Sequence, residues 1–149
     1  MKKIALLIAL ALLVFSFNEL GDKLKVMFKK GTILVEKKPW GKYERTGGKS
    51  FYSTLSGTEF VSVNGLSYGT GKYYNDSKGV RREYMHFYAE LHFLTTDLEK
   101  FETDLVGKSL IRAFIKEGVI ENDELNLENV KKFKTKYEDN ISEKRFLTK

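Results

Sequence analysis

Residues 84–94, YMHFYAELHFL, constrain the fold most, because eleven residues pass without a Gly, Pro, Asn or Asp. Every second side chain, Met85, Phe87, Ala89, Leu91 and Phe93, is apolar. This period of two, with its aromatic enrichment, is typical of a β-strand that packs one face on a core. We expect it to be the longest strand of a sheet, within about residues 80–94. The opposite face, toward water or a partner, then carries Tyr84, His86, Tyr88, Glu90, His92 and Leu94.

The residues before this stretch predict shorter strands. Residues 23–28 and 32–36 alternate around Gly31, which indicates a β-hairpin, and residues 40–43 and 51–55 are the next candidates.

A second hairpin is predicted around Asn64-Gly65, a dipeptide that accepts positive φ at both positions. Residues 66–68 should therefore fold back on a strand at residues 59–63. Residues 69–79 are rich in Gly, Asn, Asp, Ser and Lys, which predicts a flexible loop.

After residue 94 the apolar period changes from two to that of a helix. Residues 96–99 fit a helix-capping pattern, although residues 96–103 are also compatible with a further strand. Residues 105–118 predict a helix ended by Gly118, and residues 127–138 predict a second helix capped by Asn126. The fold class is therefore α+β: a meandering antiparallel sheet of about five to seven strands followed by two C-terminal helices on one face.

The N-terminus predicts export from the cytosol. Lys2 and Lys3 precede an apolar run, which matches a secretory signal peptide at residues 1–16. Residues 4–17 number fourteen, whereas spanning a bilayer takes about 20, so an uncleaved membrane anchor at 4–17 is the weaker alternative and a buried cytosolic helix the third. We expect a single domain at residues 17–139 and a basic flexible tail at 140–149.

The composition excludes several chemistries. The chain has no cysteine, so it forms no disulfide and has no thiol nucleophile or thiolate metal ligand. Its formal net charge of +6 falls to +4 when the two lysines of residues 1–16 are removed. A small excess of this size favours a solvated surface over nucleic-acid binding.

Two catalytic patterns are present without the context they need. Gly65, Ser67 and Gly69 fit G-x-S-x-G, with Asp76 and a histidine following, but this motif needs a helix directly after the serine and a parallel sheet. The tripeptide G-K-S occurs at residues 48–50 and 107–109, yet the glycine that a phosphate loop requires five positions earlier is missing in both.

The two histidines do not suggest a metal site. In one strand His86 and His92 lie about 20 Å apart, at about 3.3 Å per residue, too far to share an ion. Glu90 and His92 are close enough, but they need further ligands, and the chain has no third histidine. A small hydrolytic or metal-assisted enzyme centred on Ser67 or on Glu90 and His92 is therefore the alternative function.

Clustered aromatic residues give the main functional hypothesis. Exposed tyrosines supply rigid amphipathic contact area, as in many recognition surfaces. We expect an exported, non-enzymatic domain with no cofactor and no metal, which binds a protein, glycan or envelope component. Nucleic acid is not expected, and the membrane is met only transiently, through the signal peptide. The candidate binding residues are Tyr73, Tyr74, Tyr84, His86, Tyr88, Glu90 and His92.

Overall fold

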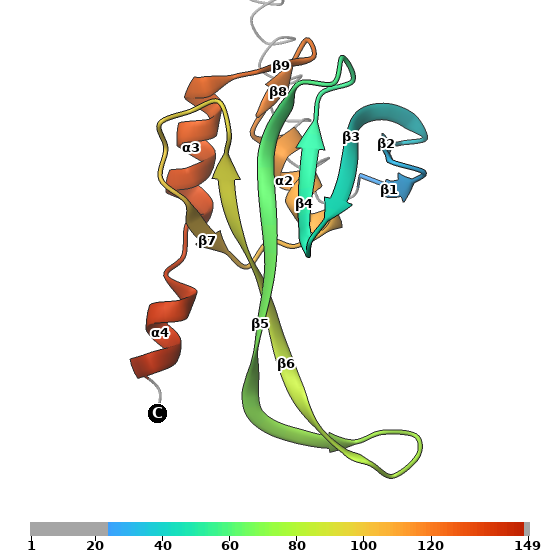
Figure 1. Cartoon of the computed structure of the whole chain (residues 1–149), viewed down its shortest axis with the longest axis vertical. Coiled ribbons are helices and arrows are strands. Elements are labelled where there is room, and N and C mark those ends of the chain that lie inside the picture. Colours follow the sequence, from blue (N-terminus) through green and yellow to red (C-terminus); the bar gives the residue numbers. More distant parts are fainter. Residues whose placement is uncertain (1–23, 148–149) are drawn as a thin grey trace, which may run out of the picture.

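The structure, a computed structural model, describes residues 24–147 (Figure 1). The predicted signal peptide at residues 1–16 and the alternative anchor at 4–17 lie outside the described residues. The strands of the main sheet are β1 (Val26–Lys29), β2 (Thr32–Val35), β3 (Lys38–Thr46), β4 (Lys49–Ser53), β5 (Glu59–Asn75), β6 (Arg81–Phe93) and β7 (Phe101–Thr103). The remaining elements are α2 (Lys108–Lys116), β8 (Ile120–Glu121), β9 (Glu124–Leu125), α3 (Leu127–Tyr137) and α4 (Ile141–Leu147).

The predicted α+β fold is confirmed. The seven strands are antiparallel and lie in the sheet in sequence order, so each pairs with the next along the chain. The hairpin of β1 and β2 is present, with Phe28 opposite Ile33. Helix α3 begins at its predicted cap, because the Asn126 side chain accepts a hydrogen bond from the Asn129 backbone N–H. Helix α2 is followed by Gly118 with a φ of 64°, the left-handed conformation that a helix end favours.

The core lies between the sheet and helices α2 and α3, and aromatic rings form its centre. Phe93 of β6 lies 6.0 Å, centroid to centroid, from Phe114 of α2 and 6.3 Å from Phe133 of α3. Phe114 and Phe133 are 4.9 Å apart. All three side chains are fully buried, so they join the sheet and both helices into one hydrophobic core.

The turn predicted at Asn64-Gly65 is wrong. Both residues belong to β5, where Asn64 pairs with Glu90 and Gly65 pairs with Ala89. Gly65 does not adopt positive φ. The predicted flexible loop at residues 69–79 is wrong for the same reason, because β5 continues to Asn75 and only residues 76–80 turn. A long pairing with β6 outweighs the local turn preference of the dipeptide.

The expectation that the strand within residues 80–94 is the longest is wrong, because the extra length gives β5 17 residues whereas β6 has 13. β4 pairs with β5 only as far as Asn64, and β7 pairs with β6 only as far as Ala89. Beyond these two residues, β5 and β6 have no neighbouring strand except each other in the part of the chain that the structure describes. They leave the sheet as a two-stranded ribbon, residues 66–88, which we call the arm, and the rest we call the head (Figure 1).

The C-terminal part differs from the expectation at two places. Residues 96–99 do not form a helix, and the alternative of a further strand holds for β7. Where a flexible tail was expected from residue 140, the structure has α4, with Ile141 buried. Hydrogen bonds from Ser142 hold α4 against β7. The backbone N–H and the hydroxyl of Ser142 donate hydrogen bonds of 2.8 and 2.7 Å to the carboxylate of Glu102 in β7.

Candidate functional site

The arm is exposed because the head covers only its base. The alternating residues of β6 show where the cover ends: Leu91 and Phe93 are buried in the core, as predicted, whereas Phe87 is 62% exposed. The expectation that Met85 and Phe87 point into the core is therefore wrong. By alternation they lie on the same side of the strand as Leu91, yet Met85 is 45% exposed.

Exposed apolar side chains gather on the arm. Within the described residues, six of the ten exposed large hydrophobic side chains belong to it. These six are Tyr73, Tyr74, Val80, Tyr84, Met85 and Phe87. Exposed apolar surface gathered on one projecting element is typical of an interaction site.

The tip of the arm is a turn held by one carboxylate, that of Asp76. It accepts hydrogen bonds from the backbone N–H groups of Lys78 (2.9 Å) and Val80 (3.0 Å), and from Nε of Arg82 (2.7 Å). Arg82 first, and then the two backbone groups, lower the pKa of Asp76 below its ordinary value of 3.8. The Asp76 carboxylate is therefore ionised, and its hydrogen bonds and ion pair stabilise the turn.

A bulge between Gly69 and Tyr73 interrupts the pairing of the arm. The carboxylate of Glu83 crosses the face of Gly69, so closely that a Cβ there would lie 2.4 Å from its carboxyl carbon. Its oxygen accepts a hydrogen bond of 2.7 Å from the backbone N–H of Gly71, which has a φ of 75°. Like Asp76 at the tip, the Glu83 carboxylate thus stabilises the backbone conformation, here at the bulge.

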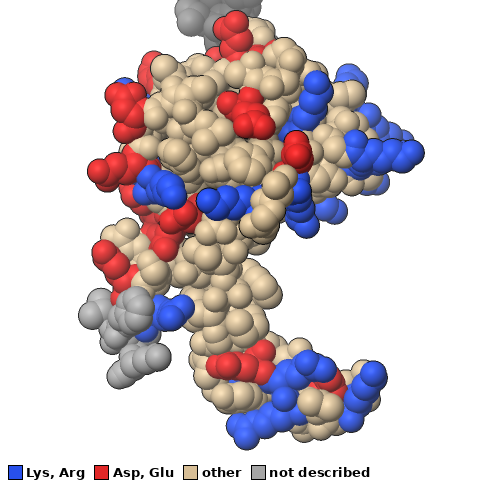
Figure 2. Space-filling model, in the orientation of Figure 1, with Lys and Arg blue, Asp and Glu red and all other residues tan. Residues whose placement is uncertain are grey.

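Basic and aromatic side chains of the distal arm remain exposed. Lys72, Lys78 and Arg81 form no ion pair within residues 24–147. The guanidinium of Arg81 lies 4.2 Å from the centre of the Tyr73 ring. On the opposite side of the ribbon, Tyr74 and Tyr84 lie 4.6 Å apart. Figure 2 shows the basic side chains gathered at the end of the arm.

Two of the predicted binding residues lie at the base of the arm rather than on an open face. Tyr88 is 5% exposed, so the expectation that it points to water or a partner is wrong. Its ring lies 6.1 Å from that of Tyr68, which in turn lies 5.8 Å from the guanidinium carbon of Arg145 in α4. Burial, and then Glu102, raise the pKa of Tyr88. His86 is half-buried, with Nε2 2.7 Å from the Asp104 carboxylate.

The other two, Glu90 and His92, lie on the head. Glu90 has Lys100 at 3.7 Å as its ionic partner, and His92 pairs with Ser62 across the sheet. The seven candidates therefore separate into three places, and only Tyr73, Tyr74 and Tyr84 share the exposed distal arm.

The register argues against the serine hydrolase pattern. Ser67 pairs with Phe87, one residue away from the pair of Tyr68 and His86. Because neighbouring strand residues point to opposite faces, the side chains of Ser67 and His86 lie on opposite sides of the ribbon. Asp76 lies at the tip. Among residues 24–147, no three side chains of the metal-binding types come together as an ion would require.

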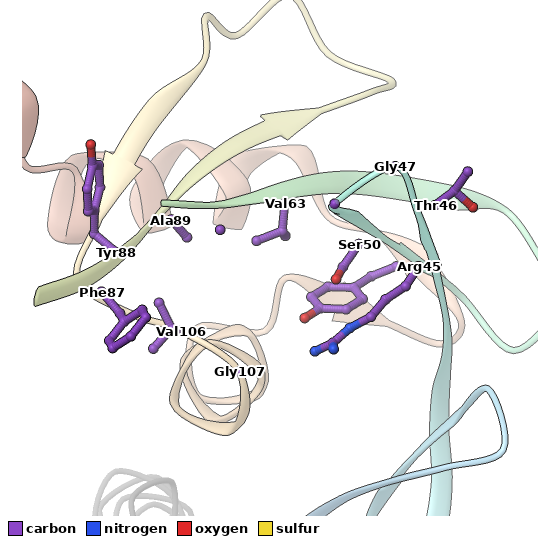
Figure 3. Close-up of a pocket in the computed structure, with 13 residues that line it drawn as sticks. Arg45, Thr46, Gly47, Ser50, Val63, Phe87, Tyr88, Ala89, Val106 and Gly107 are labelled. Atoms are coloured by element: carbon purple, nitrogen blue, oxygen red, sulfur yellow. The ribbon is translucent and has the colours of Figure 1, made fainter. Parts of the chain in front are cut away.

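A groove of about 510 Å³ lies at the base of the arm, where the sheet passes the start of α2 (Figure 3). Its floor includes Val63 and Ala89, and Phe87 and Val106 stand beside each other on one side. Arg45, from the β3–β4 hairpin, stands on the other side. The volume lies within the range of about 300–1,000 Å³ that is common for small-molecule sites.

The sequence contained little signal for this groove. Its basic residue, Arg45, lies in β3 but outside the strands expected at residues 40–43 and 51–55, and Phe87 was expected in the core. The two G-K-S tripeptides lacked the spacing of a phosphate loop, yet Gly48, Ser50 and Gly107 all line the groove from different elements. Of the residues in the G-x-S-x-G pattern only Gly65, which pairs with Ala89, lines the groove, and the sequence does not show that pairing.

Comparisons with known proteins add nothing to this geometry, since no family model, curated protein or solved structure matches the chain. Within residues 24–147, no helix has the length and apolar character needed to cross a membrane.

Proposed function

We propose that this chain is an exported, non-enzymatic binding protein whose arm attaches to an anionic component of the cell envelope. The observation that supports this most is the use of charge on the distal arm. Asp76 and Glu83 hold the turn and the bulge, whereas Lys72, Lys78 and Arg81 face outward. The arm therefore presents a positive potential to a partner.

The tyrosines support the same proposal. Tyr73, Tyr74 and Tyr84 are exposed next to these cations, and rings of this kind combine apolar contact area with a polar hydroxyl. Ring pairs across the ribbon restrict their rotamers before binding, which reduces the entropy lost on association. The head supplies a rigid base, since β5 and β6 run from its core into the arm.

Charge reversal tests the proposal. The variant Lys72→Glu, Lys78→Glu, Arg81→Glu is compared with wild type for sedimentation with the native envelope fraction across a range of salt concentrations. We expect the affinity of the variant to fall about ten-fold or more and its salt dependence to flatten.

The matched control reverses three exposed lysines of the head, Lys29→Glu, Lys37→Glu and Lys38→Glu, which changes the net charge equally. This control should bind within about two-fold of wild type. Equal loss in both variants would show that net charge alone drives attachment and would refute the role of the arm. Export is tested separately by N-terminal sequencing from the native host, where the mature chain should begin after Ser16.

A further inference from the structure

One side of the groove at the base of the arm is lined by apolar side chains. Phe87 and Val106 are exposed in it next to the buried Val63 and Ala89, so the apolar surface of the core continues into an open site. Gly65 leaves space in this site, because a Cβ built on it would meet no atom of the described residues 24–147 within 4 Å. An aliphatic group placed here would be removed from water by side chains on its two sides.

The opposite side of the groove offers hydrogen-bond donors and no acid. Arg45 is the one charged side chain among the lining residues, and it forms no ion pair within residues 24–147. Tyr52 is 5% exposed, and no hydrogen bond among residues 24–147 involves its hydroxyl. Every side-chain polar atom that is fully buried in this range has a hydrogen-bond partner. Because the Tyr52 hydroxyl has none, it is not fully buried and is accessible from the groove. Burial raises the pKa of Tyr52, against the effect of Arg45, and keeps the hydroxyl a donor.

The start of α2 adds positive potential at the same place. Gly107, the residue at the N-cap of α2, lines the groove, supplies no capping side chain, and is followed by no acid in the first turn. No carboxylate in the first turn of α2 therefore offsets the positive end of the helix dipole. Arg45 and the hydroxyl of the largely buried Tyr52, which has no hydrogen-bond partner within residues 24–147, provide donors that point to an anion independently of the helix end.

From this pairing of donors with an apolar wall, we infer that the groove binds an amphiphilic carboxylate, a single carboxylate on an aliphatic chain. The carboxylate accepts from Arg45, Tyr52 and Ser50, and the chain lies against Phe87 and Val106. This site is distinct from the arm tip, because its ligand carries an apolar chain and contacts none of the three tip cations.

Calorimetric titration with decanoate tests the inference, and decanol and butyrate separate the two halves of the ligand. Wild-type protein should bind decanoate saturably, and decanol and butyrate much more weakly. Arg45→Gln should weaken decanoate binding about 10- to 100-fold and leave decanol unchanged, since a hydrogen bond to a charged group is lost. Tyr52→Phe should weaken decanoate binding by a smaller factor.

Gly65→Leu tests the location, because a leucine there fills the groove without requiring positive φ. We expect it to abolish decanoate binding while attachment to the envelope fraction is retained. Arg81→Gln, which removes a guanidinium at the arm tip, is the matched control and should bind decanoate like wild type.

Three results would overturn the inference: no saturable binding of decanoate to wild type, equal affinity for decanol, or wild-type affinity in Gly65→Leu. If Gly65→Leu does not fold, the effects of Arg45→Gln and Tyr52→Phe on decanoate relative to decanol decide the question. Loss of envelope attachment in the tip variant with decanoate binding intact would separate the two sites.

Discussion

Strands β5 and β6 run through both the head and the arm, but the burial of their side chains differs between the two regions. In the head, β5 and β6 have neighbours on both sides and helices on one face, so alternate side chains are buried. In the arm, the same alternation continues through Met85 and Phe87, but these side chains are exposed because no element within residues 24–147 covers them. The difference shows that an alternating pattern identifies a strand and its two faces, whereas burial depends on what packs against them.

The two regions are also stabilised differently. The head depends on a cluster of buried phenylalanine rings, while the arm depends on cross-strand pairs such as Tyr74 with Tyr84, and on the two carboxylates. A two-stranded ribbon is marginal in water on its own, so the arm depends on the head to hold its base. Matched substitutions in the two regions make this comparison quantitative.

The largest expected difference is between two phenylalanines. Phe114→Ala should lower the free energy of unfolding by about 3–5 kcal/mol, because a fully buried ring is replaced by a cavity. Phe87→Ala removes an exposed ring and should change it by less than about 0.5 kcal/mol. Urea denaturation of both variants measures the two values. A loss of several kcal/mol for Phe87→Ala would show that the arm is covered in solution.

A pair of glycines gives the next effect. A Cβ on Gly41 in β3 would lie 2.9 Å from the backbone oxygen of Ser53, so Gly41→Ala should cost about 1–3 kcal/mol by overpacking. Gly65→Ala meets no atom and should be neutral or stabilising by up to about 1 kcal/mol. Thermal unfolding of the two variants side by side checks this. Similar destabilisation in both would contradict the open space at the base of the arm.

The smallest effect is local and depends on pH. The folded pKa of Asp76 lies below 3.8, so the stability that its carboxylate contributes to the turn is present above that pH and lost as the pH falls through the lowered value. The backbone amide resonances of Lys78 and Val80 should report this transition in NMR spectra, while those of the head core stay unchanged. Arg82→Ala should move the midpoint upward toward 3.8. An unchanged midpoint would show that the ion pair does not hold the turn.

Several parts of this fold could be predicted because neighbouring residues determine them. The β1–β2 hairpin, the Asn126 cap and the glycine after α2 each depend on a few residues with strong conformational preferences. The turn formed by Glu36 and Lys37, between β2 and β3, could not be predicted from local residue preferences. Both residues have positive φ, and neither is the glycine or asparagine that this conformation favours. The ladders on each side hold that turn in place.

The candidate site was predicted only in part. Tyr73, Tyr74 and Tyr84 are exposed together, although Tyr73 and Tyr74 lie on strand β5 and not in a flexible loop. The placement of Tyr88 was wrong because α4, Tyr68 and Glu102 come together there only in the folded chain. The groove escaped detection because its lining residues come from separate strands and the start of a helix.

Alternation, capping residues and composition alone determined that this chain is α+β, that residues 84–93 belong to one strand with Leu91 and Phe93 inward, and that no cysteine chemistry is available. Only the tertiary structure decided that β5 runs straight through Asn64-Gly65 and that Met85 and Phe87 stand outside the core. The reason is physical: a dipeptide preference is worth little against a long strand ladder, and side-chain burial is decided by where the neighbouring strands and helices end.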